Sequence, residues 1–203
     1  MRKLTLSVAI TVLVTSMCAC SLHPTRSVPH LGLEAKTAYF ETLDEMEEFS
    51  DVIIVGTRLD EEVPVINTSD GHLLSCYTFS KFCISKIHKD NTSTLKEKDI
   101  ITILENEVYD EEQDIVYHVA GYNMMENGKD YLLFLQRDTY NSVEYYVSAG
   151  VNFGTVSLQD DNRKIDRYDD MGNEVVDYSR FENIWNEAIN KYVNEGSAQL
   201  TTP

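Results

Sequence analysis

Asp51-Val52-Ile53-Ile54-Val55-Gly56-Thr57-Arg58-Leu59 is the stretch of sequence that decides the fold. It is rich in Val and Ile, whose β-branched side chains favour strands. A second strand-like run extends from His72 to His88, and the turn-prone segment Asn67-Thr68-Ser69-Asp70-Gly71 separates the two runs. Two such runs around a turn segment predict a β-hairpin.

The second run breaks its alternation near its end. Phe82 and Ile84 share one face of the strand, whereas Ile87 falls on the opposite face. A single inserted residue produces such a change of parity, so we expect a β-bulge near Ser85-Lys86. A bulge there would curve the strand, as barrels require.

Four more strand-like segments follow, without helical patterns between them. We expect these strands at residues 99–104, 115–120, 131–136 and 143–151, with the turn dipeptide Asn127-Gly128 before the third. Short strands at regular spacing predict a mainly β fold, as an antiparallel barrel or a small sandwich. Residues 158–178 are acidic and turn-rich, which predicts a hairpin or an exposed loop.

A helix is predicted on each side of the strands. Thr42 and Glu45 form a capping box, so a short N-terminal helix should span residues 42–49. Ser179 and Glu182 form another, which opens an amphipathic C-terminal helix over residues 179–195, stopped by Gly196. Its apolar stripe should cover an open end of the domain's own barrel. The stripe consists of Phe181, Ile184, Trp185, Ala188, Ile189 and Tyr192.

Residues 1–19 have the organisation of a secretory signal peptide. Arg2 and Lys3 supply the positive region, and an apolar core runs from Leu4 to Val14. A membrane-spanning helix needs about 20 apolar residues, so this core is too short to span a bilayer. We therefore expect the leader to be cleaved and the protein to be exported.

The segment Met17-Cys18-Ala19-Cys20 resembles the bacterial lipobox. The resemblance implies that Cys20 carries lipid after cleavage behind Ala19, which would place the protein on the outer face of the cell membrane. Cys18 is a competing lipidation site, and an ordinary signal peptide that releases a soluble protein is the other alternative. Residues 20–36 contain Pro24, Pro29 and Gly32, which predicts a flexible stalk before a single globular domain at residues 37–203.

The mature chain is strongly acidic. Its formal charge of −17 becomes −19 when Arg2 and Lys3 leave with the signal peptide. Such a field repels phosphate backbones and anionic headgroups, so we expect no nucleic-acid partner and a membrane contact made through the lipid alone. High acidity also keeps an exported protein soluble.

Cys76 and Cys83 are the only cysteines after Cys20. Both fall in the second strand of the hairpin, where extended chain separates them far beyond the ~5.5 Å between α-carbons that a disulfide requires. We expect inert or packed thiols rather than a bridge.

Three segments together carry a family resemblance: Ser50-Asp51-Val52-Ile53-Ile54-Val55-Gly56, the strand from Tyr77-Thr78-Phe79-Ser80 to Ile87, and Glu126-Asn127-Gly128-Lys129-Asp130-Tyr131-Leu132-Leu133-Phe134-Leu135. They resemble small, uncharacterised lipoproteins and secreted proteins of Gram-positive bacteria. They are also distantly similar to the netrin-like module of tissue metalloproteinase inhibitors. The resemblance covers about residues 49–156 and implies an OB-like barrel. Inhibition is not implied, because that mechanism needs an unmodified amino-terminal cysteine and Cys20 would carry lipid.

Motifs for catalysis, cofactors or metals are not recognisable in the sequence. The five histidines are His23, His30, His72, His88 and His118, and no two have metal-ligand spacing on one element. A Gly-rich phosphate loop and a G-x-S-x-G elbow are missing. We therefore expect no catalytic, cofactor-binding or metal-binding residues, and lipid attachment at Cys20 is the one site predicted.

A cluster of acidic residues suggests calcium binding as an alternative to the absence of a metal site. Its spacing does not match an EF-hand, so a solvated acidic loop is the simpler interpretation. The cluster consists of Asp160, Asp161, Asp166, Asp169, Asp170 and Glu174.

Two classes of function remain open for the exported domain. The first is a binding module that holds a peptide, protein or saccharide on a strand face containing Tyr77, Tyr145 and Tyr146. The second is a hydrolase of envelope polymers that uses two facing carboxylates as acid and base. A calcium-stabilised surface protein is the third alternative.

Overall fold

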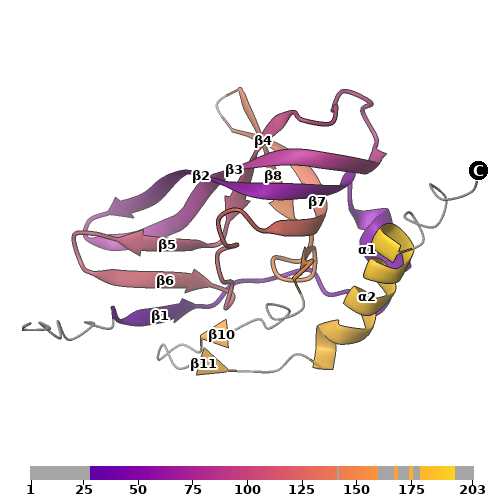
Figure 1. Ribbon diagram of the computed structural model, residues 1–203. Helices are drawn as coiled ribbons and strands as arrows, with labels where there is room; N and C mark the ends of the chain where they lie inside the picture. The colour runs from indigo at the N-terminus through magenta and orange to yellow at the C-terminus, as the bar shows by residue number, and fades with distance from the viewer. Residues whose placement is uncertain (1–27, 141, 160–166, 169–173, 176–178, 195–203) are drawn as a thin grey trace, which may run out of the picture.

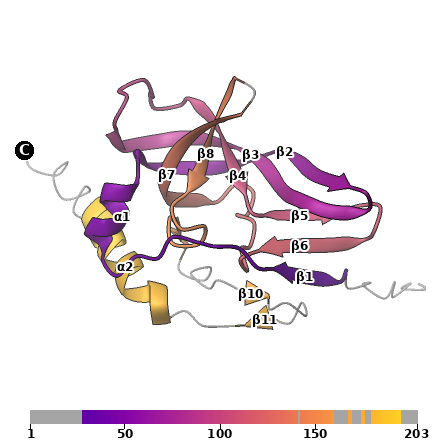
Figure 2. The same cartoon turned by 180° about the vertical axis from the view of Figure 1, so that it is seen from behind.

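The computed structural model describes residues 28–140, 142–159, 167–168, 174–175 and 179–194. Cys20, His23 and Gly196 lie outside these residues, as do Asp160, Asp161, Asp166, Asp169 and Asp170. The fold is mainly β, with two helices at one end of the molecule and a hairpin tip with a second sheet at the other (Figures 1 and 2).

The main sheet has six strands. In spatial order they are β2 (Val52–Ser69), β3 (His72–Asp90), β4 (Ile100–Glu105), β8 (Val143–Ser148), β7 (Asp130–Tyr140) and β9 (Thr155–Ser157). β4 and β8 run parallel, and the other neighbours run antiparallel. β7 also pairs with the first part of β2, so β2 has a neighbour on both sides there.

The predicted hairpin is confirmed and is longer than expected. β2 continues beyond Leu59 to Ser69, and the turn is reduced to Asp70 and Gly71, whose φ angles are 52° and 78°. Left-handed conformations at two adjacent residues suit the tight turn of a β-hairpin. The extra length of β2 pairs with β3 alone among the described strands, after an irregularity between Arg58 and Glu62.

The predicted bulge is also confirmed. Val55 pairs with Lys86 and Gly56 pairs with Ile84, which leaves Ser85 as the extra residue. The Ser85 hydroxyl donates to the carbonyl oxygen of Val55 at 3.0 Å and so fixes the bulge. Phe82 and Ile84 consequently point into the core before the strand bends.

Part of the expected stalk, residues 20–36, is a strand in the structure, which describes this segment from residue 28 onward. His30–Leu33 form strand β1, which runs parallel to β6 (Ile115–Val119), and β6 pairs antiparallel with β5 (Glu107–Asp110). Leu31 and Leu33 pack against a small core of Cys76, Val108 and Tyr117. Partial burial of these two leucines explains why this segment forms a strand, although Pro29 and Gly32 suggested a linker.

Both predicted helices are present. α1 (Leu43–Phe49) begins after Thr42, whose Oγ1 accepts from Glu45 N at 3.2 Å, while Glu45 Oε2 accepts from Glu41 N at 2.8 Å. α2 (Ser179–Ile189) continues into a π-helical turn, η2 (Asn190–Asn194).

The apolar stripe of α2 packs on its own domain, as predicted. Its residues share a core with Leu43 and Met46 of α1 and with Phe134 of β7. The Trp185 indole N–H donates to the carbonyl oxygen of Phe153 at 3.0 Å. This core is separate from the second cluster, around Phe82 and Ile84, on the inner face of the main sheet.

Within residues 158–178, two strands are described. β10 (Arg167–Tyr168) and β11 (Glu174–Val175) pair antiparallel, in agreement with the expected hairpin.

The two cysteines of β3 are free thiols, as predicted. Cys76 is buried, and its burial raises the thiol pKa to about 11, so the unreactive thiol form prevails at neutral pH.

Candidate functional site

The outer face of the main sheet carries aromatic side chains in place of the usual polar ones. Along β3, Thr78, Ser80 and Phe82 are buried, and the alternating residues Tyr77 and Phe79 point outward and are half-buried. The pleat of a strand requires this alternation, because successive side chains point to opposite faces.

Tyr77, Phe79 and Tyr145 form a continuous row, here named the aromatic strip. The ring centroids of Tyr77 and Phe79 lie 5.1 Å apart at 70°, and those of Phe79 and Tyr145 lie 5.3 Å apart at 64°. Both contacts have the edge-to-face geometry that aromatic quadrupoles favour. The strip crosses from β3 to β8 over the outer face of β4.

Aliphatic side chains border the aromatic strip. Val63 of β2 pairs with Phe79, and Leu104 of β4 pairs with Phe79 from the other side. Val63 is 54% exposed, and Val143 at the start of β8 is 61% exposed. Apolar side chains therefore lie on this surface along four neighbouring strands, β2, β3, β4 and β8.

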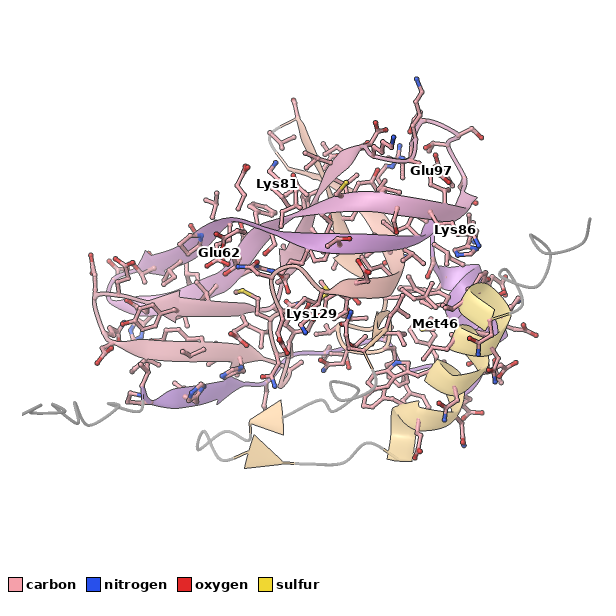
Figure 3. All side chains as sticks on the ribbon, viewed as in Figure 1. Met46, Glu62, Lys81, Lys86, Glu97 and Lys129 are labelled. Carbon is pink, nitrogen blue, oxygen red and sulfur yellow. The ribbon has the colours of Figure 1, made fainter. Side chains whose placement is uncertain are left out.

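Polar groups lie beside the aromatic strip, and one of them holds Tyr145. The Tyr145 hydroxyl donates to Asp138 Oδ2 at 2.9 Å. Burial and this nearby carboxylate raise the pKa of Tyr145 to about 12, so the phenol stays neutral. Further along β3, on the side of Phe79 away from Tyr77, Lys81 Nζ donates to the Thr102 hydroxyl at 2.9 Å, and Figure 3 places Lys81 away from α1 and α2.

Tyr146 does not belong to this surface, which corrects the expectation that it shares a strand face with Tyr145. It is 2% exposed and packs in the inner core. Adjacent residues of a strand cannot share a face, so the alternation alone excludes the pair. The structure supplies Phe79 as the third ring, and the same alternation along β3 would have indicated it.

Arg58 and Glu105 form a buried ion pair with several further hydrogen-bond partners. Arg58 Nε donates to Glu105 Oε1 at 3.1 Å. Oε2 of Glu105 accepts from the Tyr122 hydroxyl at 3.0 Å and from the Met125 backbone N–H at 2.7 Å. Arg58 also donates to Glu62 and Asn127. Burial raises the pKa of Glu105, although these partners oppose the shift.

The raised pKa of Glu105 is the shift expected of a general acid, but a substrate has no access to its carboxyl group. Both of its oxygens already accept hydrogen bonds from the protein, and its side chain is fully buried. The cluster cross-links β2, the end of β4 and the segment at Tyr122–Met125. It gives no support to the hydrolase alternative.

Two histidines that are far apart in the sequence lie in contact in the structure. Nδ1 of His30, from the expected stalk, lies 2.7 Å from Nε2 of the buried His118 on β6. The parallel pairing of β1 with β6 produces this contact, and a local pattern could not indicate it. Within the described residues, no group of three or more His, Cys, Asp or Glu side chains has an arrangement that could hold a metal ion.

Comparisons with protein-family models, curated proteins and solved structures find no match to this chain. The family resemblance in the three segments accordingly stays a prediction. In the part of the chain that the structure describes, no helix has the length and apolar character needed to cross a membrane.

Proposed function

We propose that this chain is a lipid-anchored envelope protein that binds a protein partner on the outer face of its main sheet. The aromatic strip is the observation that carries the proposal. Its three rings come from two strands far apart in the sequence, form one continuous surface and remain partly accessible. The leader and Cys20 support export and attachment to the outer face of the membrane.

The chemistry of the surface favours a protein over a saccharide. Saccharide stacking needs open ring faces, whereas these rings meet edge to face and partly cover one another. The exposed Val63 and Val143 extend the surface with aliphatic groups. Aromatic residues within an apolar patch are typical anchors of protein interfaces. The charge of the chain disfavours nucleic acid.

We also propose an OB-like organisation of the main sheet. The strands β2, β3, β4, β8 and β7 follow one another, and the additional β2–β7 pairing supports a five-stranded, partly open barrel. In OB folds the face of the second and third strands binds ligands. The corresponding strands here are β3 and β4, which lie under the aromatic strip.

Site-specific photo-crosslinking on intact cells tests the binding surface. A photoreactive phenylalanine analogue at position 79 should give discrete adducts with a protein, and Tyr77→Ser with Tyr145→Ser should abolish them. The matched control carries the same analogue at Tyr109, an exposed aromatic residue of β5 outside the strip. The same adducts from both positions, or none from position 79, would refute the proposed surface.

A further inference from the structure

The imidazole rings of His30 and His118 meet edge to edge where β1 lies along β6. Nδ1 of His30 and Nε2 of His118 are 2.7 Å apart, whereas the ring centroids are 5.0 Å apart and the planes differ by 21°. Rings stacked face to face cannot approach to 2.7 Å. The two nitrogens therefore face each other between nearly coplanar rings, which is the geometry of an N–H···N hydrogen bond.

Neighbouring acceptors fix the positions of the protons. Nδ1 of His118 lies 2.9 Å from the carbonyl oxygen of Tyr122 and 3.2 Å from Oε2 of Glu107. Both oxygens are acceptors, so this nitrogen carries hydrogen. Nε2 of a neutral His118 is then an acceptor, and His30 donates to it through Nδ1.

The hydrogen bond tolerates one positive charge on the pair but not two. A proton added to Nε2 of His30 leaves its Nδ1–H free to donate. When both rings are protonated, each of the facing nitrogens carries hydrogen and neither has a lone pair. Two imidazolium groups at this separation also repel each other.

We propose that His30 and His118 form a pH-sensitive clasp that holds strand β1 on β6 at neutral pH and releases it in acid. β1 has only four residues. Two backbone bonds mark the ends of its attachment, Val116 N to Pro29 O at 2.9 Å and Ala120 N to Leu33 O at 2.7 Å. A strand this short depends on its side-chain contacts, and the clasp sits at its first residue.

The charges around the clasp give the direction of its pH dependence. Among the described side chains, β5 contributes Glu107 and β6 contributes His118 itself. Burial and then the charge of His118 lower the pKa of His30, and Glu107 opposes them. Below the ordinary histidine pKa of about 6.5, the unfolded chain therefore binds more protons than the folded one. The stabilisation is present above that pH and is lost as pH falls below it.

Release of β1 would increase the distance from the membrane at which the domain can lie. Residues 30–36 would join the segment that precedes them, and each could add up to ~3.3–3.6 Å of extended chain. This consequence rests on the proposed tether at Cys20. The clasp itself does not, because its contacts with Glu107 and Tyr122 lie inside the domain.

Amide hydrogen exchange of the full mature chain tests the clasp, whether or not Cys20 carries lipid. Val116 and Ala120 report on β1, because their N–H groups donate to Pro29 and Leu33. After correction for intrinsic exchange rates, their protection should fall several-fold from pH 7.5 to 5.5. The N–H of Val119, which donates to Asn106 instead, should keep its protection. Equal protection of Val116 and Ala120 at both pH values would overturn the proposal.

Two variants separate titration from packing. His30→Gln keeps a donor without titrating at position 30, so protection at pH 7.5 should persist and depend less on pH. His72→Gln, at the exposed hairpin tip, should retain the wild-type pH dependence. Full pH dependence in His30→Gln would contradict the clasp.

Nitrogen-15 shifts of the two imidazoles provide a measurement that needs no variant. The clasp predicts an Nδ1–H tautomer for His118 at neutral pH. Two protonated rings with β1 still protected would contradict it.

Discussion

Nε of Arg58 lies 3.1 Å from Oε1 of Glu105, and the two side chains are 2% and 0% exposed. The pair connects β2 with the end of β4 in the interior of the domain. Each charge is compensated there by the other and by further hydrogen bonds: Arg58 donates to the Ser80 hydroxyl, and Glu105 accepts from Tyr122 and Met125. Removal of one partner would leave the other buried without its counter-charge.

Arg58→Met should therefore destabilise the domain by about 3–5 kcal/mol, the range for breaking a buried pair. Urea unfolding measures this change. The control is Glu62→Gln, because Glu62 is about half exposed and contacts the same guanidinium. The control should cost at most about 1 kcal/mol, as exposed ion pairs do. Similar losses of unfolding free energy in Arg58→Met and Glu62→Gln would show that the buried contact of Arg58 stabilises the domain no more than the exposed one.

Protonation of Asp90 should lower the free energy of unfolding in strong acid. Burial acts to raise its pKa, but hydrogen bonds from Leu95, Thr92 and Thr94 outweigh burial and lower it to about 2. A lowered carboxyl pKa stabilises the fold above its unfolded value of about 3.9, and this contribution is lost as pH falls towards 2.

Asp90→Asn removes that titration. Its unfolding free energy should be lower than that of wild type at neutral pH, and the difference should shrink between pH 4 and pH 2. Denaturant unfolding at a series of pH values checks this. A difference that stays constant over the whole series would exclude Asp90 as the source.

Substitutions of two phenylalanines of β3 test which face of the main sheet is exposed to solvent. Phe82 is fully buried in the inner core, whereas Phe79 lies in the half-exposed aromatic strip. Phe82→Ala should cost about 3–5 kcal/mol, as for buried aromatic residues. Phe79→Ala should cost roughly 1 kcal/mol, as for an average substitution. Thermal or urea unfolding compares them, and a reversed order would place the strip in the core.

Local patterns in the sequence predicted the local structure well. The capping box at Thr42, the turn ending at Gly71 and the bulge at Ser85 each depend on residues within one turn or one strand. The apolar stripe of α2 was predictable for the same reason. Helical periodicity indicates which side chains share one face of the helix, and an apolar face is buried.

Long-range contacts were not predictable in this way. β1 pairs with β6 across more than eighty residues of chain, so His30 appeared to belong to a linker. Arg58 lies in an apolar strand, and its partner Glu105 ends a different one. The alternation along β3 places Phe79 on the same face as Tyr77, but the contact between Phe79 and Tyr145 depends on how β3, β4 and β8 are arranged in the sheet.

The tether at Cys20 is the claim on which the proposed function depends most, because only an exported and anchored domain presents the aromatic strip at the envelope. Intact mass spectrometry of the protein extracted from membranes tests it directly. The account predicts a mature chain that begins at Cys20 with added acyl mass, and a Cys20→Ala form without it that leaves the membrane fraction. A wild-type chain without acyl mass, or a Cys20→Ala form that still sediments with membranes, would contradict the account.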